Sequence, residues 1–364
     1  MTALKTILLD EIDRNGPMAL ADYMARALGD ATHGYYMQRQ PFGIARQDGG
    51  DFITAPEVSQ MFGELLGAWC ADLWHRAGCP APFALVELGP GRGTLMADAL
   101  RAAAHAKGFG DAVQVHFVET SPKLRALQRQ AVPHAHWHDS VTSLPALPSI
   151  VLANEFFDAL PIAQYRRLAE GWETIAIAAN RDKTGLVFTK GKTVSNPFSP
   201  TQAGLLPEQI EIGDIVEVSS VVEAVMSEIS AHIGRHGGAL LAVDYGYAQP
   251  RMGDSFQALK HHKPVDPLAE PGLADLTAHV NFALLHRLAG EHGLTAPPVT
   301  TQGVFLRHLG LDMRCAALVE ASPPHKQRIL GERDRLAGDD QMGLLFKVLG
   351  AAHGDWPELA GFAP

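Results

Sequence analysis

Short apolar runs alternate with helical stretches along the chain. Residues 83–88, 150–153 and 239–244 are apolar runs typical of buried parallel strands, whereas residues 113–119 and 133–139 alternate as strand residues do. The stretches between them carry the spacing or the helix-forming composition of helices, at residues 94–106, 123–131 and 217–233. This alternation predicts an α/β fold with a mostly parallel sheet.

The two flanks of this region carry further elements. Residues 2–29 have helical spacing interrupted at Gly16–Pro17, and residues 58–77 predict a further helix. Residues 1–80 are therefore predicted as a helical cap contiguous with the sheet. The sequence leaves open whether this cap is a lid over a pocket. On the C-terminal side, the pattern predicts a helix at 282–292 and two last strands, which complete a seven-stranded sheet, at 299–306 and 342–351.

A large insertion separates the fourth and fifth predicted strands. Residues 172–178 and 186–189, with a turn between them, predict a β-hairpin. The connection is about 75 residues long, far beyond the usual short loop. We therefore expect a main domain over residues 81–352 with a substrate-binding insertion at about 163–236. A second segment, 254–282, has many turn residues and little periodicity, and is predicted as a functional loop.

A glycine-rich turn follows the strand at 83–88. Gly89, Gly91 and Gly93 let the backbone approach a ligand, and the helix that begins at Thr94 offers unpaired N–H groups. A dinucleotide site would place its third glycine at Thr94, and the carboxylate of Glu87 would repel a pyrophosphate. A carboxylate suits an ammonium group instead. The arrangement resembles motif I of methyltransferases that use S-adenosylmethionine (SAM), which implies that Glu87 and the three glycines bind this cofactor.

Acidic residues end the next two predicted strands. Glu119 lies 26 positions after Gly93 (119 − 93) and is predicted to accept hydrogen bonds from both ribose hydroxyls. Asp139 is a candidate for holding the adenine amino group, and Ser140 competes for that role. A surface acid at a strand end is the alternative for Glu119.

The strand at 150–153 ends in a second polar group. Asn154 is predicted to bind the cofactor, and Glu155 and Asp158 are predicted catalytic residues, because ligands of parallel α/β sheets bind at the carboxyl ends of strands. The alternative is that Glu155 and Asp158 are structural caps. His279 is a candidate proton acceptor or substrate contact, with structural packing as its alternative.

The remaining histidines and the cysteines predict no metal site. His134, His136 and His138 alternate along one strand, but no acid or cysteine stands at ligand spacing to complete a site. The three cysteines are scattered and odd in number, so we expect reduced core thiols and no disulfide framework.

Composition narrows the class of partner. The chain has 364 residues, of which 46% are hydrophobic and 19% charged, as in soluble globular proteins. Its net charge of −10 argues against nucleic acid as the main partner. No apolar run reaches the ~20 residues that span a bilayer. The acidic residues within positions 1–16 do not suit a secretion signal or transit peptide, so we expect a cytoplasmic protein.

Five stretches together resemble the MidA-type family, which includes a mitochondrial complex I assembly methyltransferase and bacterial relatives. They appear in the expected order and span nearly the whole chain, at residues 50–64, 87–96, 154–161, 237–246 and 266–282. The resemblance implies a Rossmann-like class I SAM-dependent methyltransferase core, with Thr54 and Pro56 of the first stretch also contacting the cofactor. Asn281 is a departure, because we expect an aspartate there.

The same resemblance implies a protein arginine N-methyltransferase that acts on the 49-kDa-type subunit of respiratory complex I during assembly. For a guanidinium acceptor, Glu155 and Asp158 would supply carboxylates that pair with its fork. A small-molecule O- or N-methyltransferase and a non-catalytic SAM-binding assembly factor remain as alternatives, and a dinucleotide dehydrogenase is a distant one. The sequence also leaves a homodimer open.

Overall fold

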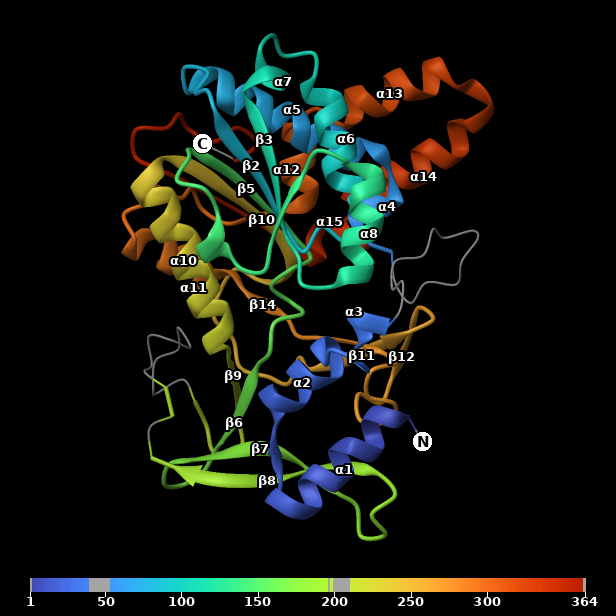
Figure 1. Cartoon of the computed structure of the whole chain (residues 1–364), viewed down its shortest axis with the longest axis vertical. Helices are drawn as coiled ribbons and strands as arrows, with labels where there is room; N and C mark the ends of the chain where they lie inside the picture. The colour runs from blue at the N-terminus through green and yellow to red at the C-terminus, as the bar shows by residue number, and fades with distance from the viewer. Residues whose placement is uncertain (1, 39–52, 196, 199–209, 363–364) are drawn as a thin grey trace. The chain divides into compact units, whose positions relative to one another are not determined.

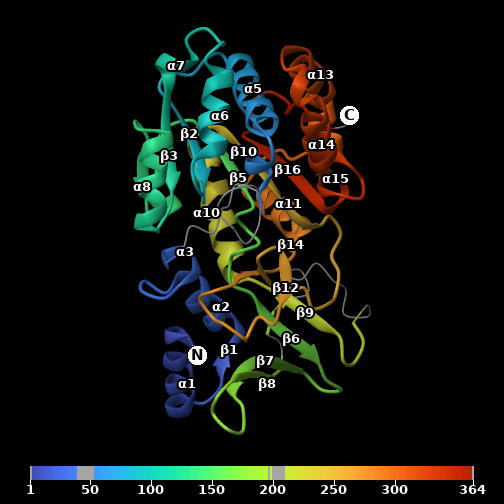
Figure 2. The ribbon, with the colours of Figure 1, turned by 90° about the vertical axis from the view of Figure 1, so that its right-hand side faces the viewer.

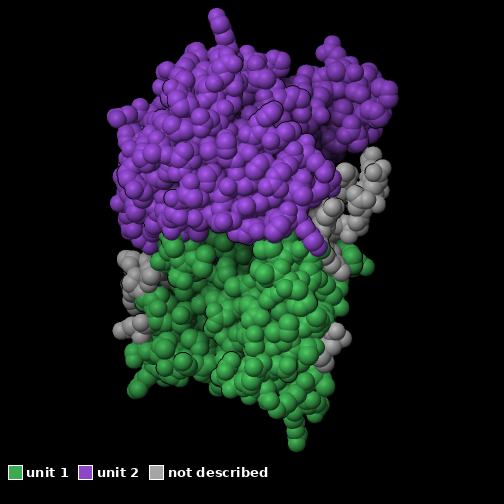
Figure 3. All heavy atoms as spheres, viewed as in Figure 1, with its two compact units in different colours: residues 1–52, 157–224, 249–284 green, residues 53–156, 225–248, 285–364 purple. Residues whose placement is uncertain are grey.

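The computed structural model describes residues 2–38, 53–195, 197–198 and 210–362 (Figure 1). Within it the chain forms two compact units, each assembled from three segments (Figure 3). Unit 1 comprises residues 1–52, 157–224 and 249–284, and unit 2 comprises residues 53–156, 225–248 and 285–364. The predicted cap, residues 1–80, contributes to both units.

Unit 2 is built on a mostly parallel sheet, as predicted. Its strands follow the order β4 (His136–His138), β3 (Val113–Val118), β2 (Phe83–Leu88), β5 (Ser149–Asn154), β10 (Gly238–Tyr247), β16 (Phe346–Ala352) and β15 (Thr300–Thr301). The first five strands are parallel, β16 is antiparallel to β10, and β15 is antiparallel to β16. Strands β2 and β5 are buried along their whole length, which explains why most of their residues are apolar.

Helices pack on this sheet through one apolar cluster. The cluster joins strand side chains to α5 (Gln60–Arg76), α6 (Thr94–Ala103) and α12 (Gln302–His308). Helices α5 and α6 approach closely because α5 carries glycine at the contact: a Cβ at Gly67 would lie 2.2 Å from the carbonyl oxygen of Ala99. The helix that follows the glycine turn is thereby fixed against the sheet.

Three predicted elements differ from the structure. The strand predicted at 299–306 is only the two residues of β15, followed by α12. The predicted last strand begins instead with a helical turn, α15 (Met342–Leu345), before β16. The helix predicted at 217–233 is preceded by β9 (Ile215–Val218) and runs as α10 (Ser220–His236).

Unit 1 contains two antiparallel sheets. The larger one has the order β1 (Met18–Ala19), β7 (Trp172–Ala179), β6 (Ala163–Arg167) and β9, with β8 (Leu186–Val194) paired to β7. The β7–β8 hairpin confirms the prediction for this region. Helices α1 (Ala3–Asn15) and α2 (Leu20–Gly29) pack on this sheet through an apolar cluster that includes Ile177 of β7 (Figure 2).

The segment predicted as an irregular loop, 254–282, is more ordered than expected. It forms the second sheet, in the order β12 (Lys263–Val265), β11 (Gln257–Lys260) and β13 (Asp275–Thr277). His261 and His262 make the tight turn between β11 and β12, with φ of 51° and 59°.

The cysteine prediction is correct for two of three residues. Cys70 and Cys315 are buried free thiols, whereas Cys79 is exposed. Among the residues that the structure describes, every helix is too short or too polar to cross a membrane.

Candidate cofactor site and family

The glycine turn connects β2 to α6 in unit 2. Gly89, Gly91 and Gly93 have φ of 60°, 53° and 84°, a region that L side chains rarely adopt, so the alternate glycines have a conformational cause. Gly93 is the N-cap of α6, and its N–H donates to the Pro90 carbonyl at 2.7 Å. The turn therefore places glycine backbone beside the start of a helix, an arrangement that suits close approach by a ligand.

Two buried acceptors stand at the strand ends beside this turn. Glu87 pairs with Leu152 in the β2–β5 register, and Asn154 follows two residues later, so both side chains lie on one face of the sheet. Glu87 is 3% exposed and Asn154 is 9% exposed. Among the described residues, Glu87 Oε2 and Asn154 Oδ1 have no hydrogen-bond partner. Two unsatisfied acceptors on neighbouring strands fit an ammonium group, which has three N–H donors.

Burial has a large effect on Glu87. It raises the pKa of the carboxyl from 4.5 to about 8, although a hydrogen bond from the Met96 N–H acts in the opposite direction. A cation arriving beside Glu87 would favour its ionised form. The site thus has the chemistry to bind the α-amino group of an amino acid moiety.

Glu119 follows β3 and is fixed by its neighbours. Its Oε1 accepts from the Ser121 N–H at 2.8 Å, and its Oε2 accepts from Gln128 Nε2 at 3.1 Å. Burial raises the pKa of Glu119, while these hydrogen bonds lower it. The carboxylate is 9% exposed and therefore retains only limited access for a further donor.

Asp139 has a different environment. It is 86% exposed and forms an ion pair with Arg125 at 2.6 Å. Its candidate competitor, Ser140, shares a hydrogen bond of 2.7 Å with Thr142. An ion pair of this kind at the surface holds Asp139 near the end of β4.

The segment 54–58 is joined to the helix that follows the glycine turn. Thr54 is the N-cap of the short helix α4 (Ala55–Val58), and both Thr54 and Pro56 are buried. Glu57 accepts a hydrogen bond of 2.6 Å from the Thr94 hydroxyl at the start of α6. This hydrogen bond joins the α4 segment to the start of α6, directly after the glycine turn. The α4 segment and the glycine turn are both predicted to contact the cofactor.

Glu155 is linked to the same segment. Its Oε1 accepts from the Ala55 N–H at 2.9 Å and from Asn154 Nδ2 at 3.2 Å. Its φ is 50°, an uncommon value for a residue with a side chain. Backbone strain of this kind concentrates at functional sites, so Glu155 stays a candidate.

The other two predicted catalytic residues belong to unit 1. Asp158 is 7% exposed, and its carbonyl accepts from the Ala278 N–H at 3.0 Å. The hydroxyl of Tyr36 donates to Asp275 at 2.9 Å, and the pKa of Tyr36 is raised by burial and then by the charges of Asp275 and Asp158. Asp158 therefore lies in a buried polar cluster.

His279 is held through its main chain. Its N–H donates to Ser255 Oγ at 2.9 Å, and its Nδ1 lies 3.2 Å from an Arg251 nitrogen. Ser255 in turn donates to the half-buried carboxylate of Glu217 through both its N–H and its hydroxyl.

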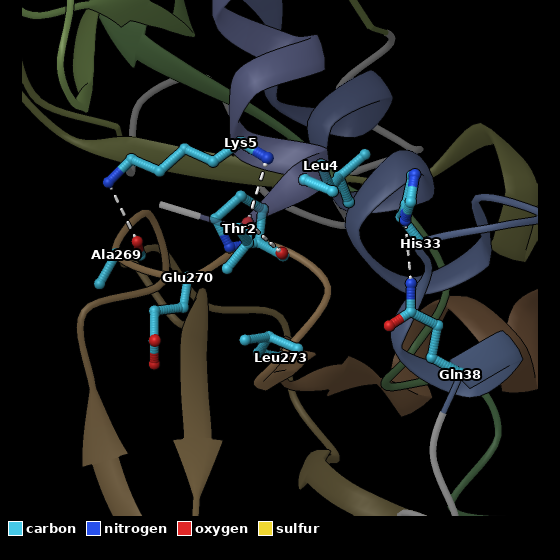
Figure 4. Close-up of a pocket in the computed structure, with 10 residues that line it drawn as sticks. Thr2, Leu4, Lys5, His33, Gln38, Ala269, Glu270 and Leu273 are labelled. Atoms are coloured by element: carbon cyan, nitrogen blue, oxygen red, sulfur yellow. Dashed lines mark hydrogen bonds between the residues drawn. The ribbon is translucent and has the colours of Figure 1, made fainter.

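Unit 1 also has a pocket of about 560 Å³ (Figure 4). Its lining includes Lys5, His33 and Glu270, and the Lys5 ammonium donates to the Ala269 carbonyl at 3.1 Å. The residues predicted as site residues are not among those that line it.

The histidine-rich strand forms a cluster of a different kind from a metal site. His116 Nδ1 of β3 lies 2.9 Å from His138 Nε2 of β4, and the His136 ring stacks on His116. Within the described part of the chain, no group of histidine, cysteine and acidic residues has the arrangement of a metal site. Burial, and then the charges of the other two histidines, lower the pKa of His116 to about 4.

Sequence reasoning missed two residues beside the predicted site. Gln128 contacts Glu119 and the glycine turn, but a polar residue within a helix carries no local signal for burial. Tyr36 contacts Asp275 from a position far away in the sequence.

Comparisons with known proteins agree with this chemistry. Residues 65–300 match the family model of S-adenosyl-L-methionine-dependent methyltransferases. A Danio rerio protein named "Protein arginine methyltransferase NDUFAF7, mitochondrial" is 35% identical over 93% of this chain and 84% of its own length. The Homo sapiens protein of the same name is 34% identical over 95% of this chain and 82% of its own length.

A solved structure gives the same picture for the fold. A Burkholderia thailandensis protein bound to S-adenosyl-homocysteine superposes with a TM-score of 0.85 at 28% identity, covering 99% of this chain and 94% of that one. The matched family model spans more than half of the chain, and the relatives match along nearly all of it. The chain therefore belongs to the family of S-adenosyl-L-methionine-dependent methyltransferases.

Proposed function

We propose that this enzyme transfers the methyl group of SAM to an arginine side chain of a protein. The observation that carries the proposal is the similarity, along nearly the whole chain, to proteins that are named protein arginine methyltransferases. The proposed acceptor is the 49-kDa-type subunit of respiratory complex I during assembly. That acceptor rests on the family resemblance. A cytoplasmic location, which the acidic residues within positions 1–16 favour, and a homodimer, which the sequence leaves open, stay predictions.

The proposed cofactor contacts divide between the two ends of the ligand. Glu87 and Asn154 would accept hydrogen bonds from the α-amino group, and the glycine turn would leave room for the methionine part. Glu119 would accept from the ribose hydroxyls and Asp139 from the adenine amino group. Thr54 and Pro56 would contact the cofactor from the α4 segment. When bound, SAM supplies an electrophilic methyl group on a sulfonium.

The proposed roles of the chain on the acceptor are charge pairing and proton removal. Glu155 and Asp158 would pair with the guanidinium and localise a lone pair on the nitrogen that receives the methyl group. His279 would contact the substrate or accept its proton. The strained backbone of Glu155 supports its role, and the buried polar surroundings of Asp158 support a role in binding a cation.

The proposal is tested by incubating the enzyme with SAM and the purified complex I subunit, followed by peptide mass spectrometry. We expect one or two added methyl groups on a single arginine. The control is Gly91→Val, a variant that we expect to lose cofactor binding. Methylation of a small molecule in place of the subunit would contradict the proposal. So would an absence of any SAM turnover while the cofactor still binds.

A further inference from the structure

Helix α8 (Pro122–Ala131) carries one fully buried polar side chain, Gln128. Both N–H groups and the oxygen of its amide form hydrogen bonds. Nε2 donates to the Gly91 carbonyl at 2.8 Å and to Glu119 Oε2 at 3.1 Å, while Oε1 accepts from Trp137 Nε1 at 2.9 Å. One side chain thus joins the glycine turn after β2, the acid after β3, and strand β4.

The partners fix the orientation of this amide. An indole N–H only donates, so the atom facing Trp137 must be the oxygen of Gln128. The two hydrogens of the nitrogen then point at two acceptors, the Gly91 carbonyl and the Glu119 carboxylate. A flipped amide would place oxygen against both acceptors and nitrogen against a donor.

Helix α8 also packs behind the turn itself. A Cβ at Gly93 would lie 3.2 Å from the Ala131 Cβ and 3.6 Å from the Gln128 Cα. One turn earlier on the same helix, the Arg125 guanidinium donates to the Glu119 and His138 carbonyls and pairs with Asp139. The acids at the ends of β3 and β4 are therefore both held from α8.

We propose that Gln128 is a positioning residue for the cofactor: it orients the Glu119 carboxylate toward the ribose and fixes the Gly91 carbonyl of the glycine turn. This inference rests on the proposed role of Glu119. Glu119 has two oxygens, and the Gln128 and Ser121 N–H groups each take one lone pair, so the remaining lone pairs point in set directions. Without Gln128 the carboxylate keeps the Ser121 hydrogen bond at Oε1 but loses its contact with Gln128 at Oε2, and burial then favours its neutral form more strongly.

The test compares two ligands, S-adenosylhomocysteine and its 2′,3′-dideoxyribose analogue, by calorimetric titration. In the natural enzyme, loss of both hydroxyls should weaken binding roughly 10- to 100-fold, the usual value of hydrogen bonds to a charged group. In Gln128→Met, which keeps side-chain length without donors, the two ligands should differ by about threefold or less.

The control is Ser149→Ala, which removes a buried hydrogen bond to His232 at the opposite end of β5. This variant should lose stability while it keeps the full discrimination between the two ligands. If Gln128 had only a structural role, Gln128→Met would also lose stability and keep the full discrimination between the two ligands. Undiminished discrimination in Gln128→Met would therefore overturn the proposal.

Two further outcomes are distinguishable. If the natural enzyme does not discriminate between the ligands, the role of Glu119 fails, and the role of Gln128 fails with it. If Gln128→Met does not fold, the unaltered protein still decides: its ¹⁵N-labelled Gln128 side-chain amide should show slow hydrogen exchange, both free and with S-adenosylhomocysteine bound. Fast exchange in the free protein would overturn the proposal.

Discussion

Glu87 makes a quantitative prediction about cofactor binding, because its carboxyl is neutral at pH 7 in the free protein. With the pKa at about 8, roughly nine-tenths of the molecules carry the proton at pH 7. If the α-amino group of the cofactor binds beside Glu87 as an ammonium, the carboxyl ionises. Binding should then release about 0.9 proton per ligand at pH 7.

The same reasoning gives the pH dependence of affinity. Removing the proton at pH 7 costs about 1.4 kcal/mol, since the pH lies one unit below the pKa. The dissociation constant should therefore fall about tenfold between pH 6 and pH 7, where the amino group of the ligand stays charged. Glu87→Gln removes both effects. At pH 8 it should weaken S-adenosylhomocysteine binding roughly 10- to 100-fold, because a charge-assisted hydrogen bond is lost.

Calorimetry in two buffers of different ionisation enthalpy measures the released proton directly. Methylthioadenosine, which lacks the amino acid moiety, should bind to the natural enzyme and to Glu87→Gln with equal affinity and without proton release. Glu64→Gln, a change in α5 that affects ion pairs with Arg101 and Arg314, is the matched control and should behave as the natural enzyme. Equal affinity of Glu87→Gln for S-adenosylhomocysteine, with no proton released by the natural enzyme, would refute the assignment.

Four further predictions follow from the structure. Folding raises the pKa of Glu87, so the folded state binds more protons than the unfolded state between pH 4.5 and about 8. The free energy of unfolding of the free protein should therefore fall as the pH rises through this range. Urea titrations at several pH values should show this fall in the natural protein and not in Glu87→Gln. For His116 the pH dependence of stability has the opposite sign, because burial lowers its pKa. Its contribution to the free energy of unfolding is present above pH 6.5 and is lost as the pH falls toward about 4. His116→Phe should therefore make stability depend less on pH in this range, as followed by circular dichroism during acid unfolding. Gly91→Val should abolish SAM binding in a titration, whereas Gly78→Val, also at positive φ but with open space around it, should lose only stability, by about 1–2 kcal/mol. Glu155→Gln should retain SAM affinity and lower the turnover number by about tenfold or more in a methyl-transfer assay, and unchanged turnover would make Glu155 a structural cap.

The glycine turn and the strands around it could be predicted because their signals are local. Buried strands such as β2 are mostly apolar, and the positive φ at Gly89 favours glycine, so both leave a signal in a short stretch of sequence. The β7–β8 hairpin could be predicted for the same reason, because its two strands follow one another in the sequence with only a turn between them. The short apolar run at 299–306 does not distinguish a strand from a helix, because buried strands and buried helix segments both carry such runs.

Other features depend on contacts between distant residues. The strands β11 to β13 are three or four residues long, too short to show a period, and they exist because they pair with one another. Gln128 is polar in a helix, and only its three partners, from three different chain segments, explain its burial. The exposure of Asp139 and its pairing with Arg125 likewise follow from tertiary placement.

The position of β16 has a consequence for protein synthesis. This strand, residues 346–352, lies between β10 and β15, yet β10 ends at residue 247, about 100 residues earlier. At the usual ~5–20 residues per second, a ribosome needs several seconds between making the two strands. During that interval the nascent chain must keep one side of β10 from pairing with other chains. We expect premature termination before residue 346 to yield an aggregating product, and molecular chaperones to be needed most while these codons are being translated.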